Sequence, residues 1–319
     1  FKYKCIFKFT MSEESSVRNE EVNEKVNEKD KISSLILSGG GHIGFCQIGS
    51  LYCLEENNFI IRENIKNIFC TSAGSLVSVI YALNYEKSEL YKYILERPWE
   101  NVFEINLLQL LNFYTNKGLF DINFFEKILD PLLLGKSLSE KITLKEFYDF
   151  TNINIYFHSV ELNSFKEDVI SHENYPGLPL VHAVYMSSAV PMVFVPCFYN
   201  NCCYVDGGIL NNYPLSTFYN KIQNNETSGI GLKGRKSHKK NKTIPVNSSN
   251  NLLDLLQIYI GHIINKFRPK NKNKISNEIG FNVGSLNSKN AIEVITSKEI
   301  RMKYIEEGYN TTLEFIKNR

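Results

Sequence analysis

A run of three glycines joins a short apolar stretch to a helical one near the start of the chain. Residues 32–41 read Ile-Ser-Ser-Leu-Ile-Leu-Ser-Gly-Gly-Gly, and the apolar side chains of residues 43–54 then recur at mostly three- and four-residue steps. Residues 65–70 predict a second strand and residues 72–83 a second helix. Strand, glycine turn, helix, strand, tight turn and helix in this order are typical of a parallel sheet with crossover helices. The sequence therefore predicts an α/β protein.

The rest of the chain divides by composition. Residues 12–31 have no aromatic residue and only valine as an apolar type, so we expect 1–31 to be a disordered polar leader, with Met11 as a candidate natural start. Residues 32–220 form the predicted main domain, 221–250 a mobile loop rich in Lys and Asn, and 251–319 a helical segment packing on that domain. Further helices are predicted at 121–134 with Asp121 as N-cap, 179–190, 252–267 and 289–317. Further strands are predicted at 152–162, 168–173 and 202–208.

Charge and hydropathy exclude several classes of protein. Lysine and arginine number 36 against 34 acidic residues, a net charge of +2, so we expect no nucleic-acid partner. No apolar run approaches the ~20 residues of a membrane span, and the first ten residues are too short for a secretory signal. We therefore expect an intracellular, cytoplasmic protein, with peripheral membrane contact as an option. The seven cysteines form no C-x-x-C pair and no metal-ligand spacing, so we expect no metal and no cofactor.

The glycine turn itself suits an anion. Gly39, Gly40 and Gly41, followed by Gly44, would present backbone N–H groups and the positive end of a helix dipole. The anion could be a phosphate or the oxyanion of an acyl transfer. A dinucleotide fold needs an acidic residue at the end of the second strand, where this chain has Thr71 and Ser72. A phosphate-binding P-loop needs a Gly-Lys-Ser/Thr that is absent.

Two more stretches suggest acyl transfer. Residues 70–74, Cys-Thr-Ser-Ala-Gly, resemble the G-x-S-x-G nucleophile elbow, with Cys70 in place of the first glycine. The alternative is that Ser72 merely caps a helix. Asp206 ends a predicted strand before Gly207 and Gly208, so its carboxylate could lie at the sheet edge beside Ser72. The alternative is a structural aspartate that bonds within its own turn.

Four motifs in order make the sequence similar to a known family. These are GGGxxGxxxxGxL (39–51), TSAGS (71–75), SSAVPxxFxP (187–196) and DGGxxxNxP (206–214). From Leu35 to Tyr219 the chain resembles the patatin-like phospholipases. The resemblance implies a three-layer α/β/α fold with a mainly parallel sheet and a Ser–Asp dyad without histidine.

The same resemblance assigns roles to residues. It implies that Ser72 is the nucleophile, Asp206 the proton acceptor, and Gly39, Gly40 and Gly41 the oxyanion hole. Supporting positions are Gly44, Cys70, Gly74, Gly207 and Gly208. The implied function is a lipid acyl hydrolase acting on fatty-acyl esters of phospholipids or neutral lipids. Cys70 departs from the motif's glycine, and Ile43 stands where the family often has a basic residue.

Several alternatives stay open. The same dyad would serve an acyltransferase or a small-ester esterase, and the two departures allow a lipid-binding protein without activity. A Ser-His-Asp triad would need His238 or His262, since only these histidines follow Asp206, and neither has a strand-end setting. Residues 252–267 have an apolar face that suits either a membrane interface or the core, and we favour the core.

Overall fold

A central sheet organises the described part of the chain. The computed structural model describes residues 32–103, 107–222, 228–235, 252–267, 273–282 and 293–319. Its main sheet has eight strands in the order β10-β9-β1-β2-β4-β8-β7, and β5 also pairs with β4. Their bounds are β1 Ser34–Leu37, β2 Asn67–Thr71, β4 Asn154–Glu161, β5 Lys166–Ile170, β7 Cys197–Tyr199, β8 Cys202–Asp206, β9 Gly229–Gly234 and β10 Asn277–Phe281. The prediction of an α/β fold with a mainly parallel sheet is confirmed.

One side of this sheet is parallel and the other side is antiparallel. Strands β10, β9, β1, β2 and β4 run parallel to one another, whereas β5 and β8 pair antiparallel with β4, and β7 pairs antiparallel with β8. A hairpin can make the antiparallel part, but the parallel part needs crossover helices. The helices α2 and α3 are such crossovers, and they follow the two strands that the sequence predicts first.

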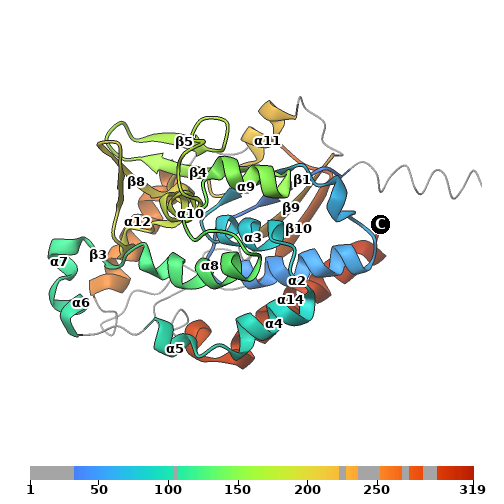
Figure 1. The fold of residues 1–319 in the computed structure, drawn as a ribbon, viewed down its shortest axis with the longest axis horizontal. Helices are drawn as coiled ribbons and strands as arrows, with labels where there is room; N and C mark the ends of the chain where they lie inside the picture. The colour runs from blue at the N-terminus through green and yellow to red at the C-terminus, as the bar shows by residue number, and fades with distance from the viewer. Residues whose placement is uncertain (1–31, 104–106, 223–227, 236–251, 268–272, 283–292) are drawn as a thin grey trace, which may run out of the picture.

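Helices cover both faces of the sheet (Figure 1). Alternate residues of the same strands point to opposite faces, so Leu35 and Cys70 join one buried cluster while Ile36 and Phe69 join another. The first cluster includes side chains of α2, α3, α8, α10 and α14, and the second includes Leu215 and Phe218 of α11. The three-layer α/β/α arrangement is therefore confirmed.

The helices have the following bounds. Before the middle of the chain they are α2 Ile43–Glu56, α3 Ala73–Ala82, α4 Lys87–Glu96, α5 Trp99–Val102, α6 Leu107–Leu111, α7 Phe113–Asn116, α8 Asn123–Gly135 and α9 Leu144–Thr151. After it they are α10 Leu180–Ser188, α11 Leu215–Lys221, α12 Leu252–Phe267 and α14 Lys298–Lys317, with 3-10 turns at Arg62–Asn64 and Gly207–Ile209.

The last helix, α14, packs along α2. A Cβ on Gly308 would strike the backbone of Cys46, so the two helices approach closely at this glycine. The Ser50 hydroxyl and the Thr312 hydroxyl hydrogen-bond across the same contact at 2.6 Å. A C-terminal segment thus covers the helix that follows the glycine turn.

A small second sheet lies at one end of the molecule. Strand β3 (Gly118–Phe120) pairs in parallel with β6 (Met192–Phe194). Helices α6 and α7 directly precede β3 and stand beyond it at that end (Figure 1). This arrangement ties residues 107–120 to the segment that follows α10.

The structure differs from the sequence prediction mainly after residue 221. Strand β9 lies inside the range predicted as a loop, and β10 lies inside the segment predicted as helical. For β9 the glycine content explains the difference, because a Cβ on Gly231 would strike the Tyr213 side chain and one on Gly229 the Phe218 ring. Glycine leaves room for these two side chains in β9, so this strand has few of the β-branched residues that usually mark a strand. The predicted leader, 1–31, and most of 236–250 lie outside the described residues.

Two smaller differences concern predicted helices. Helix α8 begins at Asn123 with Ile122 at the N-cap position, although the Asp121 carboxylate still accepts a bond from the Asn123 N–H at 3.1 Å. The helix predicted at 289–317 is interrupted at Ser297, because residues 293–296 are helical and α14 then begins at Lys298. Residues 289–292 lie outside the described part of the chain. Helix α12 has the predicted bounds, and its Leu252 and Tyr259 side chains are exposed.

Candidate active site

Ser72 occupies a strained turn between β2 and α3. Its φ of 54° and ψ of −124° lie in a region that residues with a Cβ rarely adopt, and a structure keeps such strain only when its surroundings enforce it. A Cβ on Gly74 would lie 2.5 Å from the Leu37 carbonyl oxygen of β1. Glycine at this position therefore allows α3 to start close against the sheet, as a nucleophile elbow requires.

Hydrogen bonds from another helix hold this turn. The Ser187 hydroxyl of α10 accepts from the Ser72 N–H at 3.1 Å and donates to the His158 carbonyl of β4 at 2.7 Å. It also bonds the Ser75 hydroxyl at 2.8 Å. All these groups are buried, where a satisfied polar network fixes a unique arrangement. Ser187 thus fastens the elbow to both α10 and β4.

Cys70 fits the position where the motif has glycine. Its side chain is fully buried on the α3 face of the sheet, where Sγ donates to the Tyr156 carbonyl at 3.4 Å and accepts from the Ser78 hydroxyl at 3.4 Å. Burial raises the pKa of this thiol to about 12, so it stays protonated. The positive φ in this turn belongs to Ser72 and not to Cys70. The side chain therefore lies in ordinary strand backbone.

Asp206 lies at the same level of the sheet as Ser72. Thr71, the last residue of β2, pairs with His158 of β4, and Asp206, the last residue of β8, pairs with Ser159. Because neighbouring strands lie about 4.8 Å apart, the ends of β2 and β8 are separated by about 10 Å, with β4 between them. Strand β8 runs antiparallel to β4, so Asp206 reaches this level from the direction opposite to that of Ser72.

Backbone groups fix the Asp206 turn. The Gly208 N–H donates to Asp206 Oδ1 at 2.6 Å, and the Asp206 N–H donates to the Ala189 carbonyl at 3.0 Å. A Cβ on Gly207 would strike the His158 carbonyl, so glycine lets this turn lie directly on β4. The carboxylate is buried with a fixed orientation.

Asn212 joins the glycine turn to the Asp206 turn. Its carbonyl accepts from the Gly39 N–H at 3.0 Å, and its side-chain Nδ2 donates to the Gly39 carbonyl at 3.1 Å. Its Oδ1 lies 2.6 Å from the positions that a Cβ would take on Gly39 and on Gly208. A Cβ on Gly39 would also lie 2.9 Å from the Ser72 Cβ. Asn212 therefore sits where the three turns meet.

The glycine turn presents two backbone donors. Gly40 has φ 144° and Gly41 φ 56°, conformations that favour glycine. Among the described residues neither N–H has an acceptor, whereas the Gly39 N–H is used by Asn212. Helix α2 begins two residues after Gly41, so the positive end of its dipole lies at the same place.

Ile43, the second departure from the motif, packs over this turn. A Cβ on Gly40 would lie 2.5 Å from its Cδ1, and Gly234 of β9 also lies against that atom. An apolar contact thus connects the glycine turn to β9 at the position where a basic residue is common in the family.

The histidines lie in other settings. His158 is fully buried and faces α11, where its Nδ1–H donates to the Cys70 carbonyl at 3.1 Å and its Nε2 accepts from Thr217 at 2.9 Å. Burial lowers the pKa of His158 to about 4, so it is neutral. His42 is buried beside the Tyr304 ring, and His262 is exposed on α12. His238 lies outside the described residues.

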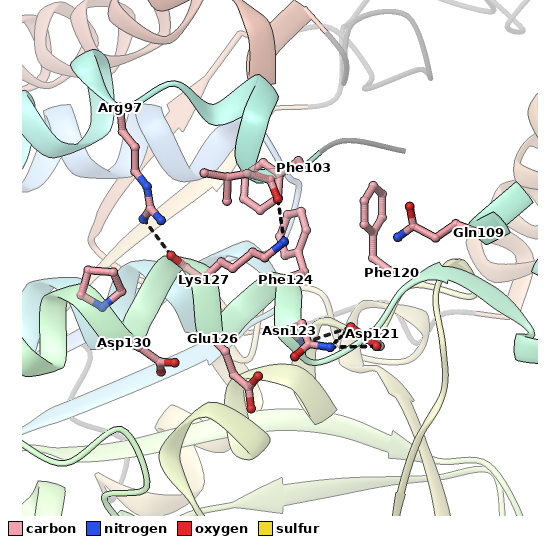
Figure 2. A pocket seen from close by; sticks show the side chains of 12 residues that line it. Arg97, Phe103, Gln109, Phe120, Asp121, Asn123, Phe124, Glu126, Lys127 and Asp130 are labelled. Carbon is pink, nitrogen blue, oxygen red and sulfur yellow. Dashed lines mark hydrogen bonds between the residues drawn. The ribbon is translucent and has the colours of Figure 1, made fainter. Parts of the chain in front are cut away.

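A cavity of about 500 Å³ lies apart from these turns, between the α4–α5 segment and α8 (Figure 2). Neither Ser72 nor Asp206 lines it. Its two cations are already engaged, because Arg97 donates to the Lys127 carbonyl at 2.7 Å and Lys127 to the Val102 carbonyl at 3.1 Å. The hydroxyl, the carboxylate and the backbone donors of the Ser72, Asp206 and glycine turns therefore form the candidate site, and this cavity does not.

The described residues contain neither a metal-binding cluster nor a membrane-spanning helix. No three His, Cys, Asp or Glu side chains gather there as a metal ion would require. No helix in that part of the chain has the length and apolar content to cross a bilayer.

Ser187 and Asn212 each belong to one of the four motifs, but the sequence alone indicates no role for either. Ser187 bonds Ser72 across 115 positions of the chain, and Asn212 bonds Gly39 across 173. A single sequence carries no sign of which distant turn a polar side chain will reach. Their place in two motifs was the available signal.

Comparisons with known proteins agree with the motifs. Residues 35–219 match the family described as patatin-like phospholipase. A probable lipid hydrolase, 463L of Invertebrate iridescent virus 6, is 29% identical over 203 residues, which cover 62% of this chain and 68% of that protein. Lysophospholipase NTE1 of Scheffersomyces stipitis is 26% identical over 196 residues, covering 59% of this chain and 11% of that protein. The solved structure of VipD from Legionella pneumophila aligns with a TM-score of 0.49 at 15% identity, over 90% of this chain and 67% of that one.

Proposed function

The chain belongs to the patatin-like phospholipase family, and on that premise we propose that it is a lipid acyl hydrolase using Ser72 and Asp206. The observation that carries the proposal is the strand register, which sets the ends of β2 and β8 at one level on either side of β4. The glycine turn meets both ends through Asn212. A hydroxyl, a carboxylate and free backbone donors are the groups that acyl transfer needs.

In the first step, the Ser72 hydroxyl attacks the carbonyl carbon of a fatty-acyl ester. Asp206 accepts the hydroxyl proton, and the C–O bond to the leaving alcohol breaks as that alcohol takes the proton. The acyl group is then held on Ser72 Oγ. The hydrogen bond from the Gly208 N–H to Asp206 Oδ1 keeps the carboxylate oriented during this transfer.

We assign stabilisation of the oxyanion to the N–H groups of Gly40 and Gly41. Gly39 has a different role, because its N–H is bonded to Asn212 and its missing side chain leaves room beside Ser72. Loss of one oxyanion donor typically costs ~10²–10³ in rate, so the turn matters nearly as much as the dyad.

In the second step, water attacks the acyl-enzyme. Asp206 accepts a proton from that water and returns it to Ser72 Oγ as the fatty acid leaves. The carboxylate thus serves both steps and no histidine takes part, which agrees with a His158 that is neutral and bonded on the α11 face.

The names of two relatives support lipid esters as the substrate class, since one is a probable lipid hydrolase and the other a lysophospholipase. The sequence is also compatible with transfer of the acyl group to an acceptor other than water. The product distinguishes the two, because a hydrolase releases free fatty acid.

Fatty-acid release tests the proposal. Wild type, Ser72→Ala and Asp206→Asn are compared on mixed phospholipid and triacylglycerol vesicles and on a soluble short-chain ester. We expect each variant to lose about 10⁴-fold or more in rate, as loss of a serine nucleophile does elsewhere. A covalent serine probe should label wild type and not Ser72→Ala.

Two results would count against the mechanism. Turnover by Ser72→Ala would remove the nucleophile assigned here, and loss of turnover in His262→Ala would restore a triad. Absence of both labelling and turnover in folded wild type would favour a lipid-binding protein without activity.

A further inference from the structure

Helices α6 and α7 present apolar side chains to solvent. We define the leucine face as Leu107, Leu108, Leu110, Leu111 and Tyr114. Leu107 exposes 72% of its surface and Tyr114 90%. Single exposed leucines are common on proteins, but four within five residues beside an exposed tyrosine form a contiguous patch, and such patches mark interaction sites.

The one polar side chain of α6 turns inward. Gln109 lines the cavity described above (Figure 2). Its Nε2 donates to the Leu119 carbonyl at 3.4 Å. An ordinary surface helix buries its apolar side and exposes its polar side. Helix α6 exposes its leucines and turns its glutamine inward, so its outer surface is suited to contact with an apolar partner.

The charge of this segment matches a lipid surface. Residues 107–116 contain no charged residue, whereas 22% of the whole chain is charged. Lys117 follows at the end, exposed, with its Nζ bonded to the Thr115 carbonyl at 3.2 Å. Leucines that enter acyl chains, a tyrosine at their edge and a lysine that reaches phosphate form the usual set of an interfacial segment. An acidic residue, which lipid phosphates would repel, is absent from residues 107–117.

A short path of backbone bonds connects the leucine face to the proposed dyad. Strand β3 follows α7 at once and pairs with β6, with Phe120 opposite Phe194. Just before β6, the Ala189 carbonyl accepts the Asp206 N–H. The β3–β6 pairing therefore links the leucine face to the segment that holds the Asp206 turn. The face lies at the end of the molecule where α6 and α7 are seen in Figure 1.

We propose that the leucine face of α6 and α7 is the surface by which this protein docks onto a phospholipid bilayer. The leucine side chains enter the outer acyl region, and Lys117 contacts lipid phosphate. The choice of lipid as the partner rests on the proposed function, but the docking is a separate event from ester cleavage and is measured separately.

Vesicle binding of the full chain tests the proposal. The Ser72→Ala protein serves as the parent, so that vesicles stay intact, and it is compared with the same protein carrying Leu108→Glu and Leu111→Glu. The probe is phosphatidylcholine vesicles, with and without phosphatidylglycerol, in a flotation assay. Leu134→Glu is the matched control, because Leu134 is exposed to a similar degree on α8 but lies outside the leucine face.

We expect the double substitution to lower partitioning at least tenfold, since burial of a single leucine corresponds to about that factor or more. Leu134→Glu should bind as the parent does. With Ser72 intact, the double variant should keep its rate on a soluble short-chain ester and lose rate on vesicles.

Two outcomes overturn the docking proposal. One is unchanged partitioning of the double variant. The other is a parent that self-associates through this face, so that the double variant is monomeric while vesicle binding is unaffected. Failure of the proposed function looks different, because wild type would then bind vesicles through the leucine face and release no fatty acid from any ester.

Discussion

The Ser72 elbow and the leucine face place polar and apolar groups in opposite ways. At the elbow, buried hydroxyls of Ser72, Ser75 and Ser187 are satisfied by one another and by backbone. On α6, apolar side chains face solvent while the amide of Gln109 turns inward. Each region departs from ordinary burial, but in a different way.

The difference lies in how each departure is offset. The φ of Ser72 costs on the order of 1–3 kcal/mol, and the bonds from α10 and β4 are the contacts that hold it. Full burial of a leucine side chain stabilises a protein by about 1.5–3 kcal/mol, and no described residue provides that burial for the exposed leucines of α6. The bonds that hold the elbow are therefore all made by described residues, whereas no described residue covers the leucine face, and docking onto a bilayer would supply that burial.

Asn212→Ala tests whether the elbow region depends on its internal bonds. The change removes the Nδ2 bond to the Gly39 carbonyl and leaves the backbone bond between the same residues. We expect kcat on a soluble ester to fall about 10²-fold with KM unchanged, because misplacing a catalytic group by ~1 Å costs about that much.

The neighbouring amide provides the control for Asn212. Asn211 Nδ2 bonds Glu167 at 2.8 Å instead of the glycine turn, so Asn211→Ala should keep the wild-type kcat. Equal rates for both variants would mean that the side chain of Asn212 does not position the oxyanion donors.

His158 should make the sheet beneath the elbow sensitive to acid. Its pKa is about 4 in the folded protein because burial disfavours the charged ring, and about 6.5 when unfolded. The unfolded chain then binds the extra proton first, so the free energy of unfolding is highest above pH 6.5 and falls as the pH drops towards 4. The expected loss is about 3 kcal/mol.

Urea unfolding at pH 7 and pH 4.5 measures this effect. His158→Gln should lose most of the difference between the two pH values, and His262→Gln, on the exposed side of α12, should retain it. Glu167, 3.5 Å from His158 Nε2, has its pKa raised by burial and so acts in the opposite sense, which is why the histidine variant is needed. Equal pH dependence in all three proteins would contradict the assignment.

Cys70→Gly restores the family's residue at the elbow. It removes a buried side chain that bonds Tyr156 and Ser78, so we expect about 1–3 kcal/mol less stability in urea and a kcat within a few-fold of wild type. Cys70→Ala separates packing from backbone entropy, since glycine costs roughly 0.5–1 kcal/mol more than alanine in a strand. A tenfold rise in kcat for either variant would show that the cysteine distorts the elbow.

The first two strands and helices were predictable because their chemistry is local. An apolar strand, a glycine turn and a periodic helix follow each other within residues 32–83. The positive φ angles of Gly40 and Gly41 favour glycine, and Gly74 is needed where α3 approaches β1. The position of Asp206 at a strand end was predictable for the same reason. Its approach on an antiparallel strand was not, because strand direction depends on pairing with β4.

The remaining features depend on distant parts of the chain. Strand β9 uses glycines to accommodate Tyr213 and Phe218, so its sequence is that of a loop until those side chains are in place. The segment Leu-Leu-Gln-Leu-Leu of α6 would by composition alone be assigned to a core. Its exposure follows from where β3 and β6 pair, which local periodicity does not encode.

Lys117→Asn is the mildest test of the leucine face. Asparagine tolerates the φ of 65° at this position, so the change removes a charge with little backbone cost. A lysine near an anionic surface contributes about 1 kcal/mol, so we expect roughly fivefold weaker binding to vesicles containing phosphatidylglycerol at low salt. The effect should vanish at high salt and on pure phosphatidylcholine, because screening and the absence of net lipid charge both remove the attraction. Lys141→Asn, an exposed lysine just before α9, should bind as wild type does, and an equal loss in both variants would mean that overall charge, and not this face, governs the contact.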